Sequence, residues 1–147
     1  MSAAEAPTST VRCPDCDKPI RVKAVPRGTP RCPFCKKPVP WIVNATEETF
    51  GAETTSSVPV LVDLWAPWCA PCRQVAPVLE QVARRYAGRI KVVKLNVDEA
   101  QRTSARLGVQ SIPTLLLVRD GRVADRVVGA LPAPQLDRWL TPHLAPA

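Results

Sequence analysis

The sequence lacks any long apolar segment. Its longest apolar runs, Val58–Trp65 and Leu115–Val118, fall far short of the ~20 residues that a membrane-spanning helix needs. The first ten residues are small and polar, and Glu5 stands where a signal peptide would carry positive charge. These absences predict a soluble protein that stays in the cytoplasm.

Glycine-rich phosphate-binding loops are also absent, since the chain has only six glycines and none falls in such a motif. We therefore expect no organic cofactor held by the chain itself. Large apolar side chains are scarce in residues 1–40, which instead hold eight of the seventeen prolines. That segment cannot bury a core of its own and needs a metal or a partner.

What the chain does have is six cysteines. In an unexported protein we expect cysteines to be metal ligands or catalytic thiols, because cytosolic reductants keep structural thiols reduced. From Trp41 onward, strand-like and helix-like segments alternate, which is typical of an α/β domain. We therefore expect a disordered segment at 1–11, a small metal-binding module at 12–40 and an α/β domain at 41–147.

Two Cys-x-x-Cys pairs, Cys13/Cys16 and Cys32/Cys35, are separated by fifteen residues. This is the spacing of a four-cysteine zinc site, in which Zn²⁺ accepts four thiolates tetrahedrally. The pattern predicts a zinc ribbon with one structural Zn²⁺. Iron would fit the same geometry, and two disulfides or free thiols are the alternative.

Positive charge is concentrated in the same region. The chain has a net charge of +7, and residues 1–40 carry eight Lys and Arg against three Asp and Glu. Four thiolates around one Zn²⁺ would lower that excess of five to about three. This reduction in positive charge disfavours nucleic acid as a partner.

The segment after residue 40 predicts alternating strands and helices. In chain order, we expect a strand at 41–44, a helix at 46–54, a strand at 58–65, a helix that follows Cys72 and ends at Gly88, a strand at 90–97, a helix at 99–107, strands at 114–118 and 122–129, and a helix at 136–144. Asp120-Gly121 predicts an antiparallel hairpin between the last two strands. The sum is a mixed central sheet with helices on both faces.

Lys91, at the start of one strand, is interpreted as a solvated side chain.

The remaining pair, Cys69 and Cys72, lies between the end of a buried strand and the start of a helix. The partial positive charge of a helix N-terminus stabilises a thiolate, so Cys69 is the expected nucleophile. Cys72, one turn into the helix, is placed to attack the resulting mixed disulfide. Pro71 fixes the helix start, and Trp65 and Trp68 provide apolar walls. The alternatives are a further metal half-site or inert core cysteines.

Asp63 interrupts the apolar run at 58–65. Burial of a carboxylate is costly and should raise its pKa. Six residues before Cys69, it could accept the proton of Cys72 through a water. The alternative is an aspartate at the strand end that reaches solvent.

Several short motifs follow one another in the order and spacing of one known family. They are Leu61-Val62-Asp63-Leu64-Trp65-Ala66-Pro67-Trp68-Cys69-Ala70-Pro71-Cys72, Ala76-Pro77, Val93-Lys94-Leu95-Asn96-Val97-Asp98, Ile112-Pro113-Thr114, Asp120-Gly121 and Val128-Gly129-Ala130. Over residues 42–145 the chain resembles thioredoxin. One departure is Ala70, which replaces the glycine of the family's usual Cys-Gly-Pro-Cys and bears on the reduction potential.

The resemblance implies the thioredoxin fold. It implies a cis bond before Pro113, where the residues alone give trans as the default, and a proton-transfer role for Asp63 with Lys94 nearby. It also implies a groove in which a target peptide pairs with the backbone of Ile112. The substrate-binding residues of that groove are Trp68, Ile112, Pro113 and Gly129.

A zinc ribbon in front of such a domain resembles the thioredoxin 2 subgroup of bacteria. That resemblance implies a protein-disulfide reductase that works by dithiol–disulfide exchange in cytoplasmic thiol redox homeostasis. Its partners would be disulfide-containing proteins and an NADPH-dependent thioredoxin reductase. Two rival interpretations are a redox-inactive scaffold whose ribbon docks nucleic acid or protein, and a catalyst that forms or isomerises disulfides.

Overall fold

A five-stranded mixed sheet forms the centre of the computed structural model, which describes residues 8–13, 15–23 and 30–145. Its strands are β3 (Ile42–Ala45), β4 (Val60–Trp65), β5 (Lys91–Asn96), β6 (Thr114–Arg119) and β7 (Arg122–Val128). Their order is β3-β5-β4-β6-β7. The first three in this order are parallel, and β6 and β7 are antiparallel to their neighbours. The predicted mixed sheet and its closing hairpin are confirmed.

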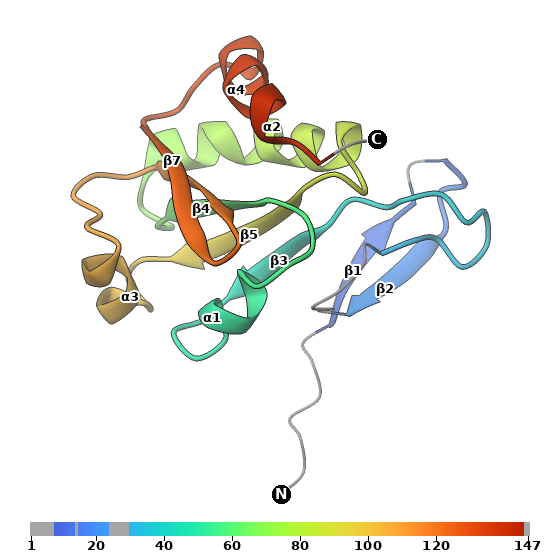
Figure 1. Cartoon of the computed structure of the whole chain (residues 1–147), viewed down its shortest axis with the longest axis horizontal. Helices are drawn as coiled ribbons and strands as arrows, with labels where there is room; N and C mark the ends of the chain where they lie inside the picture. Colours follow the sequence, from blue (N-terminus) through green and yellow to red (C-terminus); the bar gives the residue numbers. More distant parts are fainter. Residues whose placement is uncertain (1–7, 14, 24–29, 146–147) are drawn as a thin grey trace, which may run out of the picture.

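Helices cover both faces of the sheet (Figure 1). α2 (Ala70–Arg85) and α4 (Ala133–Leu140) lie on one face, and α1 (Phe50–Glu53) and α3 (Gln101–Arg106) lie on the other. A 3-10 helix, Thr141–His143, follows α4. The helix expected over 46–54 is shorter in the structure and consists of α1 alone. The residues before it form a turn, because the side-chain hydroxyls of Thr46 and Thr49 each accept the backbone N–H of the other residue. None of the described helices is both long and apolar enough to cross a membrane.

β4 is buried on both faces, as its apolar run predicts. Leu61 packs with Val75 of α2, whereas Val62 and Leu64 pack in the core on the opposite face. Side chains alternate along a strand. Asp63 therefore points to the same face as Leu61, which is the face that α2 covers.

The N-terminal module consists of a hairpin and a second, similar turn. β1 (Thr8–Arg12) pairs antiparallel with β2 (Pro19–Lys23). Cys13 donates its N–H to the carbonyl of Lys18 (3.0 Å), and in the second turn Cys32 donates to Lys37 (2.9 Å). The two Cys-x-x-Cys motifs thus form matching turns.

The predicted disorder at 1–11 is wrong for its last part. Thr8–Arg12 is ordered as a strand because its backbone pairs along its whole length with β2. Residues 1–7 lie outside the described residues.

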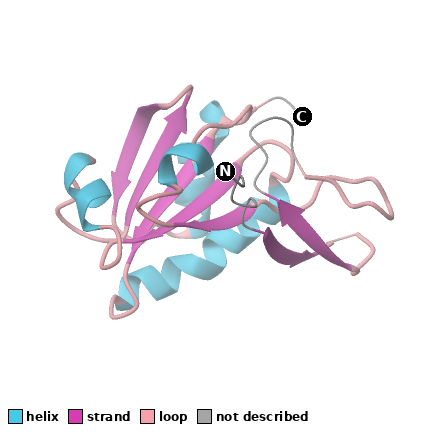
Figure 2. Cartoon of the chain, turned by 90° about the horizontal axis from the view of Figure 1, so that it is seen from below, coloured by secondary structure: helices cyan, strands magenta, loops and turns pink. Residues whose placement is uncertain are grey.

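The module lies at the end of the sheet where the parallel strands begin (Figures 1 and 2). Trp41 joins the two parts: its side chain is fully buried and its carbonyl accepts the N–H of Val92 (2.8 Å). One apolar cluster contains Trp41, residues of the sheet, and the buried side chains of the module, which are Cys13, Ile20, Cys32 and Val39. α2 begins at the opposite end of the sheet (Figure 1).

Lys91, at the start of β5, is buried, and the expectation of a solvated side chain is wrong. Its Nζ lies 3.1 Å from Oε1 of Glu53, and the two side chains are 1% and 3% exposed. The ammonium also lies 4.6 Å from the ring centroid of Trp41. Burial lowers the pKa of Lys91, and Glu53 opposes that shift. The carboxylate and the ring offset the loss of water around this charge.

Removing one partner of this ion pair should destabilise the fold more than replacing both. Glu53→Ala leaves the ammonium of Lys91 buried without its carboxylate, and we expect a loss of about 3 kcal/mol in the free energy of unfolding. The double variant Glu53→Leu/Lys91→Met replaces the pair with apolar groups and should recover most of that loss. Urea unfolding at pH 7 measures both. A double variant as unstable as Glu53→Ala would contradict this account.

Candidate active site and metal-binding cluster

Cys69 and Cys72 form a disulfide at the start of α2. Their Cα atoms are 5.3 Å apart, and their side chains are 4% and 3% exposed. Cys69 is the N-cap residue of α2, and its Sγ accepts the backbone N–H of Cys72 (3.2 Å). Pro71 occupies the first turn, where a missing N–H costs no helical bond. Because a helix N-terminus stabilises negative charge, this position favours a thiolate at Cys69.

The loop after α3 lies against the dithiol. Its Ile112–Pro113 bond is cis, as the family resemblance implies. Sγ of Cys69 lies 3.9 Å from the carbonyl oxygen of Ile112, and Gly129 donates its N–H to the carbonyl of Pro113 (2.8 Å). Gly129 has a φ of 101°, a conformation that glycine adopts readily. The fold thus brings together Cys69, the Ile112–Pro113 pair and Gly129, from three segments that are far apart in the sequence.

An apolar cavity of about 420 Å³ opens beside Ile112. Its apolar walls are Trp68, Val97, Val109 and Ile112. The ring of Trp68 is 68% exposed, and its Nε1 donates to Oδ2 of Asp98 (2.9 Å). Sequence reasoning placed Trp68 and Ile112 in a groove, but it did not assign Val97, Val109 or Asp98 to that groove. The only signal for Asp98 was its place in the Val93–Asp98 motif, because its contact with Trp68 joins two separate loops.

A second, polar cavity has a volume of about 540 Å³. It lies between the residues that precede α1 and those at the start of α3. Its carboxylates come from Glu47, Glu48, Asp98 and Glu99, and Arg102 is the one cation that the cavity contains. Glu47 is already engaged, since it accepts the backbone N–H of Thr103 (2.9 Å). Asp98 belongs to this cavity and also holds Trp68. The acidic surface therefore borders the apolar groove.

Asp63 is 1% exposed, and neither of its carboxylate oxygens has a hydrogen-bond partner among the described residues. Burial raises its pKa from 3.8 to about 6, and Lys94, beside it on β5, opposes the shift. Trp65 lies on the same face of β4, packs against Cys69 and Cys72, and has Nζ of Lys94 5.1 Å from its ring centroid. Burial of Asp63 is confirmed, and the alternative of a solvated carboxylate is wrong.

The four remaining cysteines form one cluster in the N-terminal module. The sulfur atoms of Cys13, Cys16, Cys32 and Cys35 lie within 4.8 Å of one another. A metal with four thiolate ligands at about 2.3 Å needs sulfurs about 3.8 Å apart. Two pairs, Cys13/Cys35 and Cys16/Cys32, are 3.5 Å apart, and Cys32 also accepts the N–H groups of Phe34 and Cys35 (3.4 Å each). The cluster could hold a metal ion.

A Cys-x-x-Cys disulfide at a helix N-terminus, with a cis-proline loop against it, defines a thiol–disulfide oxidoreductase. The sequence model of the family described as Thioredoxin matches residues 41–142. The chain belongs to the thioredoxin family. The match begins after the four-cysteine cluster, which is therefore an addition to the family domain.

Individual bacterial thioredoxins match the same region. The chain is 52% identical over 89 residues to a thioredoxin of Haemophilus influenzae, covering 60% of this chain and 83% of that protein. It is 51% identical over 100 residues to thioredoxin 1 of Nostoc sp., covering 67% and 94%. A thioredoxin of Bacillus subtilis is 48% identical over 103 residues, covering 70% and 98%.

Asp63 should make the fold less stable as the pH rises. Its pKa of about 6 in the fold lies above the ordinary 3.8, so the folded state holds the proton more tightly. The fold carries no penalty below pH 4 and is progressively destabilised as the pH rises through 6. The shift corresponds to about 3 kcal/mol at pH 7.5.

Asp63→Ala should therefore be more stable than the wild type at pH 7.5, and should lose this advantage at pH 4. Urea unfolding at both pH values measures the difference, with the exposed Glu80→Ala as control. An advantage of equal size at both pH values would contradict the raised pKa.

Proposed function

We propose that this protein reduces disulfide bonds of other proteins, with Cys69 as the attacking thiol and Cys72 as the resolving thiol. The observation that supports this best is the position of Cys69. It caps α2, accepts the N–H of Cys72 and lies 3.9 Å from the carbonyl of Ile112, beside the apolar cavity. The N-terminus of α2 stabilises a thiolate at Cys69. This thiolate is placed to contact a substrate chain that binds along the loop containing Ile112.

The reaction proceeds in two exchanges. The thiolate of Cys69 attacks one sulfur of the substrate disulfide, forms a mixed disulfide and releases the other sulfur as a thiolate. Cys72 then loses its proton and attacks Sγ of Cys69, which releases the second substrate sulfur and leaves the Cys69–Cys72 disulfide. Two electrons pass from the protein to the substrate.

Asp63 assists the second exchange in this proposal. A carboxylate with a pKa of about 6 can accept the Cys72 proton near neutral pH and return it later. It lies on the face of β4 that α2 covers, two residues before Trp65. Lys94 beside it favours the ionised form, and a water completes the path to Cys72.

The substrate binds beside the dithiol as an added strand. Its backbone pairs with that of Ile112, which precedes the cis-proline. The exposed ring of Trp68 and the backbone near Pro113 and Gly129 form the walls. Asp98 keeps the Trp68 ring in place.

Electrons reach the oxidised dithiol from another protein, which we propose to be an NADPH-dependent thioredoxin reductase. The proposed compartment is the cytoplasm, where the four free cysteines of the module remain reduced. There the protein contributes to general thiol redox homeostasis.

We assign the metal as one structural Zn²⁺ on Cys13, Cys16, Cys32 and Cys35. Two matching turns, the N–H···S bonds to Cys32 in the second turn, and four sulfurs within 4.8 Å of one another support this choice. When bound, Zn²⁺ cross-links the two turns. The proposed division is a zinc ribbon at 12–40 and a thioredoxin domain at 41–147.

Cys72→Ser should trap substrates as mixed disulfides through Cys69, because the second exchange has lost its nucleophile. Turnover of insulin disulfides should fall at least ~1,000-fold, as for loss of other essential nucleophiles. Non-reducing electrophoresis with mass spectrometry of the linked peptides measures the trap. Cys69→Ser is the control and should trap nothing. Trapping that requires Cys72 instead would reverse the two roles.

The full chain should bind one Zn²⁺, and a chain that begins at Pro40 should bind none. Zinc binding supplies folding free energy on the order of 10 kcal/mol in such modules, so a strong chelator should unfold residues 12–39. The truncated chain should keep its disulfide reductase activity but lose about 2 kcal/mol of stability, because Trp41 loses the apolar cover of the module. Metal analysis, insulin reduction and urea unfolding measure these effects. A folded truncated chain without activity would contradict the division.

A further inference from the structure

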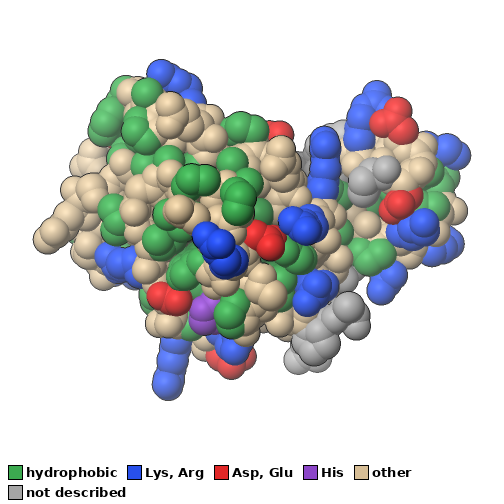
Figure 3. Space-filling view, turned by 90° about the horizontal axis from the view of Figure 1, so that it is seen from above, with side chains coloured by type: hydrophobic (Ala, Val, Ile, Leu, Met, Phe, Trp, Pro, Cys, Tyr) green, Lys and Arg blue, Asp and Glu red, His purple; other side chains and the backbone are tan. Residues whose placement is uncertain are grey.

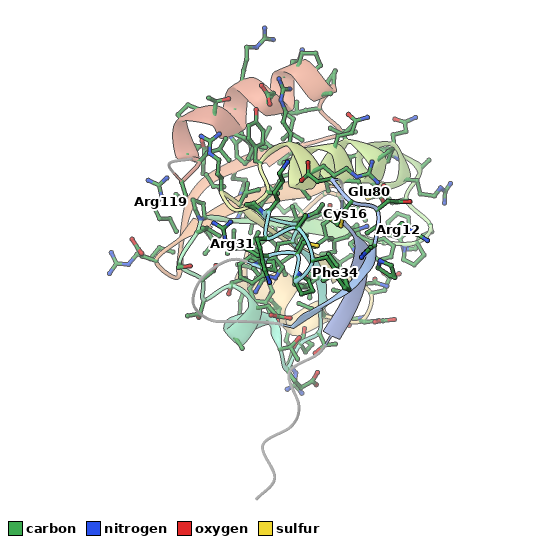
Figure 4. All side chains as sticks on the ribbon, turned by 90° about the vertical axis from the view of Figure 1, so that its right-hand side faces the viewer. Arg12, Cys16, Arg31, Phe34, Glu80 and Arg119 are labelled. Atoms are coloured by element: carbon green, nitrogen blue, oxygen red, sulfur yellow. A yellow bond between two sulfur atoms is a disulfide. The ribbon has the colours of Figure 1, made fainter. Side chains whose placement is uncertain are left out.

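Several features of the zinc ribbon have no role in the proposed reaction. Phe34 is 58% exposed between the cysteines of the second turn. Figure 4 shows Phe34 and Cys16 on one face of the N-terminal module, between Arg12 and Arg31. Figure 3 shows Lys and Arg side chains gathered on the same module. Cys35, next to Phe34, is half-buried, whereas Cys32 is fully buried. The tip of the second turn therefore offers an apolar ring, an accessible sulfur and positive charge together.

The ribbon and the dithiol of one molecule lie at opposite ends of the sheet in the folded chain. The ribbon packs where β5 begins, since Val92 donates to the carbonyl of Trp41. The dithiol follows the other end of β4, where Trp65 pairs with Asn96. The six residues of β5 place about 17 Å between these two ends of the sheet at 3.3 Å per residue. While the ribbon stays packed at its end of the sheet, a reaction between the two groups requires two molecules.

The surface around the dithiol matches the tip of the second turn. The apolar cavity beside Trp68 and Ile112 can take the ring of Phe34 when Cys35 faces Cys69. The neighbouring polar cavity, which Asp98 joins to Trp68, carries Glu48 and Glu99 beside a single cation, Arg102. These carboxylates can face Lys36 and Lys37, which follow Cys35. Lys36 has no carboxylate partner among the described residues, and Lys37 has one exposed partner at 3.5 Å.

We propose that the oxidised zinc ribbon of one molecule is a substrate for the dithiol of a second copy. The inference rests on the proposed function and names one of its substrates. The docking segment is the turn Pro33–Lys37, whose Phe34 enters the apolar cavity while its lysines meet the acidic surface. The exchange restores the four thiols that the metal requires.

A hydroperoxide is the oxidant that creates this substrate. Each molecule of hydrogen peroxide takes two electrons and two protons from one pair of ribbon thiols, and yields one disulfide and two waters. The pairs at 3.5 Å, Cys13/Cys35 and Cys16/Cys32, are close enough to join once the metal has left. Two peroxides therefore convert the four thiols into two disulfides.

Repair reverses this oxidation in two-electron steps. The thiolate of Cys69 in one copy attacks Sγ of Cys35 in the other, and Cys13 leaves as a thiolate. Cys72 then attacks Cys69, which releases the Cys35 thiolate and leaves the Cys69–Cys72 disulfide. The Cys16/Cys32 pair follows through the half-buried Cys16. Full repair of one ribbon consumes two reduced dithiols.

The test uses two full-length proteins. The acceptor is the Cys69→Ser/Cys72→Ser variant, oxidised with hydrogen peroxide and freed of zinc. The donor is the reduced, zinc-loaded wild type in threefold excess, with one equivalent of Zn²⁺ added and free zinc followed with a metal indicator. We expect zinc uptake by the acceptor to be at least ~100-fold faster than with a Cys69→Ser donor, since exchange needs the nucleophile. A Cys72→Ser donor should give a two-chain adduct linked through Cys69 and Cys35.

Variants of the acceptor test the docking surface. Phe34→Ala should slow zinc uptake about 10-fold, as for loss of an apolar anchor, whereas Val123→Ala, another exposed apolar residue, should not. Lys36→Glu/Lys37→Glu should slow it about 10-fold at low salt. A Glu48→Lys/Glu99→Lys donor should restore the rate of that acceptor. Failure of this charge exchange to restore the rate would overturn the docking geometry.

Insulin reduction by the same donor separates the two proposals. If the donor reduces insulin but does not speed zinc uptake beyond the Cys69→Ser donor, the ribbon is not its substrate and the reductase function stands. If it reduces neither, the proposed function fails as well. An adduct through the buried Cys13 or Cys32 would overturn the assignment of the docking turn.

Discussion

The N-terminus of α2 is the constraint on which the rest of the site depends. A reactive thiolate needs stabilisation at the surface of a folded domain, and the start of a helix provides it through backbone N–H groups. β4 delivers the chain to this point from within the core, so Cys69 becomes the N-cap residue and Cys72 lies one turn below it. The cis-proline loop lies against the same sulfur, with the carbonyl oxygen of Ile112 3.9 Å from Sγ of Cys69.

Two buried ionisable residues of the sheet, Lys91 and Asp63, have different surroundings. Lys91 is paired with Glu53 at 3.1 Å and lies 4.6 Å from the ring centroid of Trp41, so its charge is compensated. Asp63 has no hydrogen-bond partner among the described residues, and its pKa rises to about 6. A buried carboxylate without a hydrogen-bond partner is destabilising, and the raised pKa suits the proton-transfer role that we propose for Asp63.

Local patterns predicted much of this molecule. The apolar run of β4, the Asp120-Gly121 hairpin, the dithiol at a helix start and the four clustered cysteines all depend on residues close in sequence. The burial of Lys91 was not predictable, because Glu53 and Trp41 come from other segments. Asp98 and Val109 were missed for the same reason: a loop partner leaves no periodic signal in the chain.

The sequence by itself determined most elements of the α/β domain, the position of the dithiol at a helix start and the four cysteines that could hold a metal. These properties follow from spacing over a few residues and from the periods of strands and helices. Tertiary structure alone decided that Asp63 has no polar partner, that the Ile112–Pro113 bond is cis, and that the ribbon lies at the far end of the sheet from the dithiol. Those features depend on how distant segments pack, because burial and distance are properties of the assembled core and of no single segment.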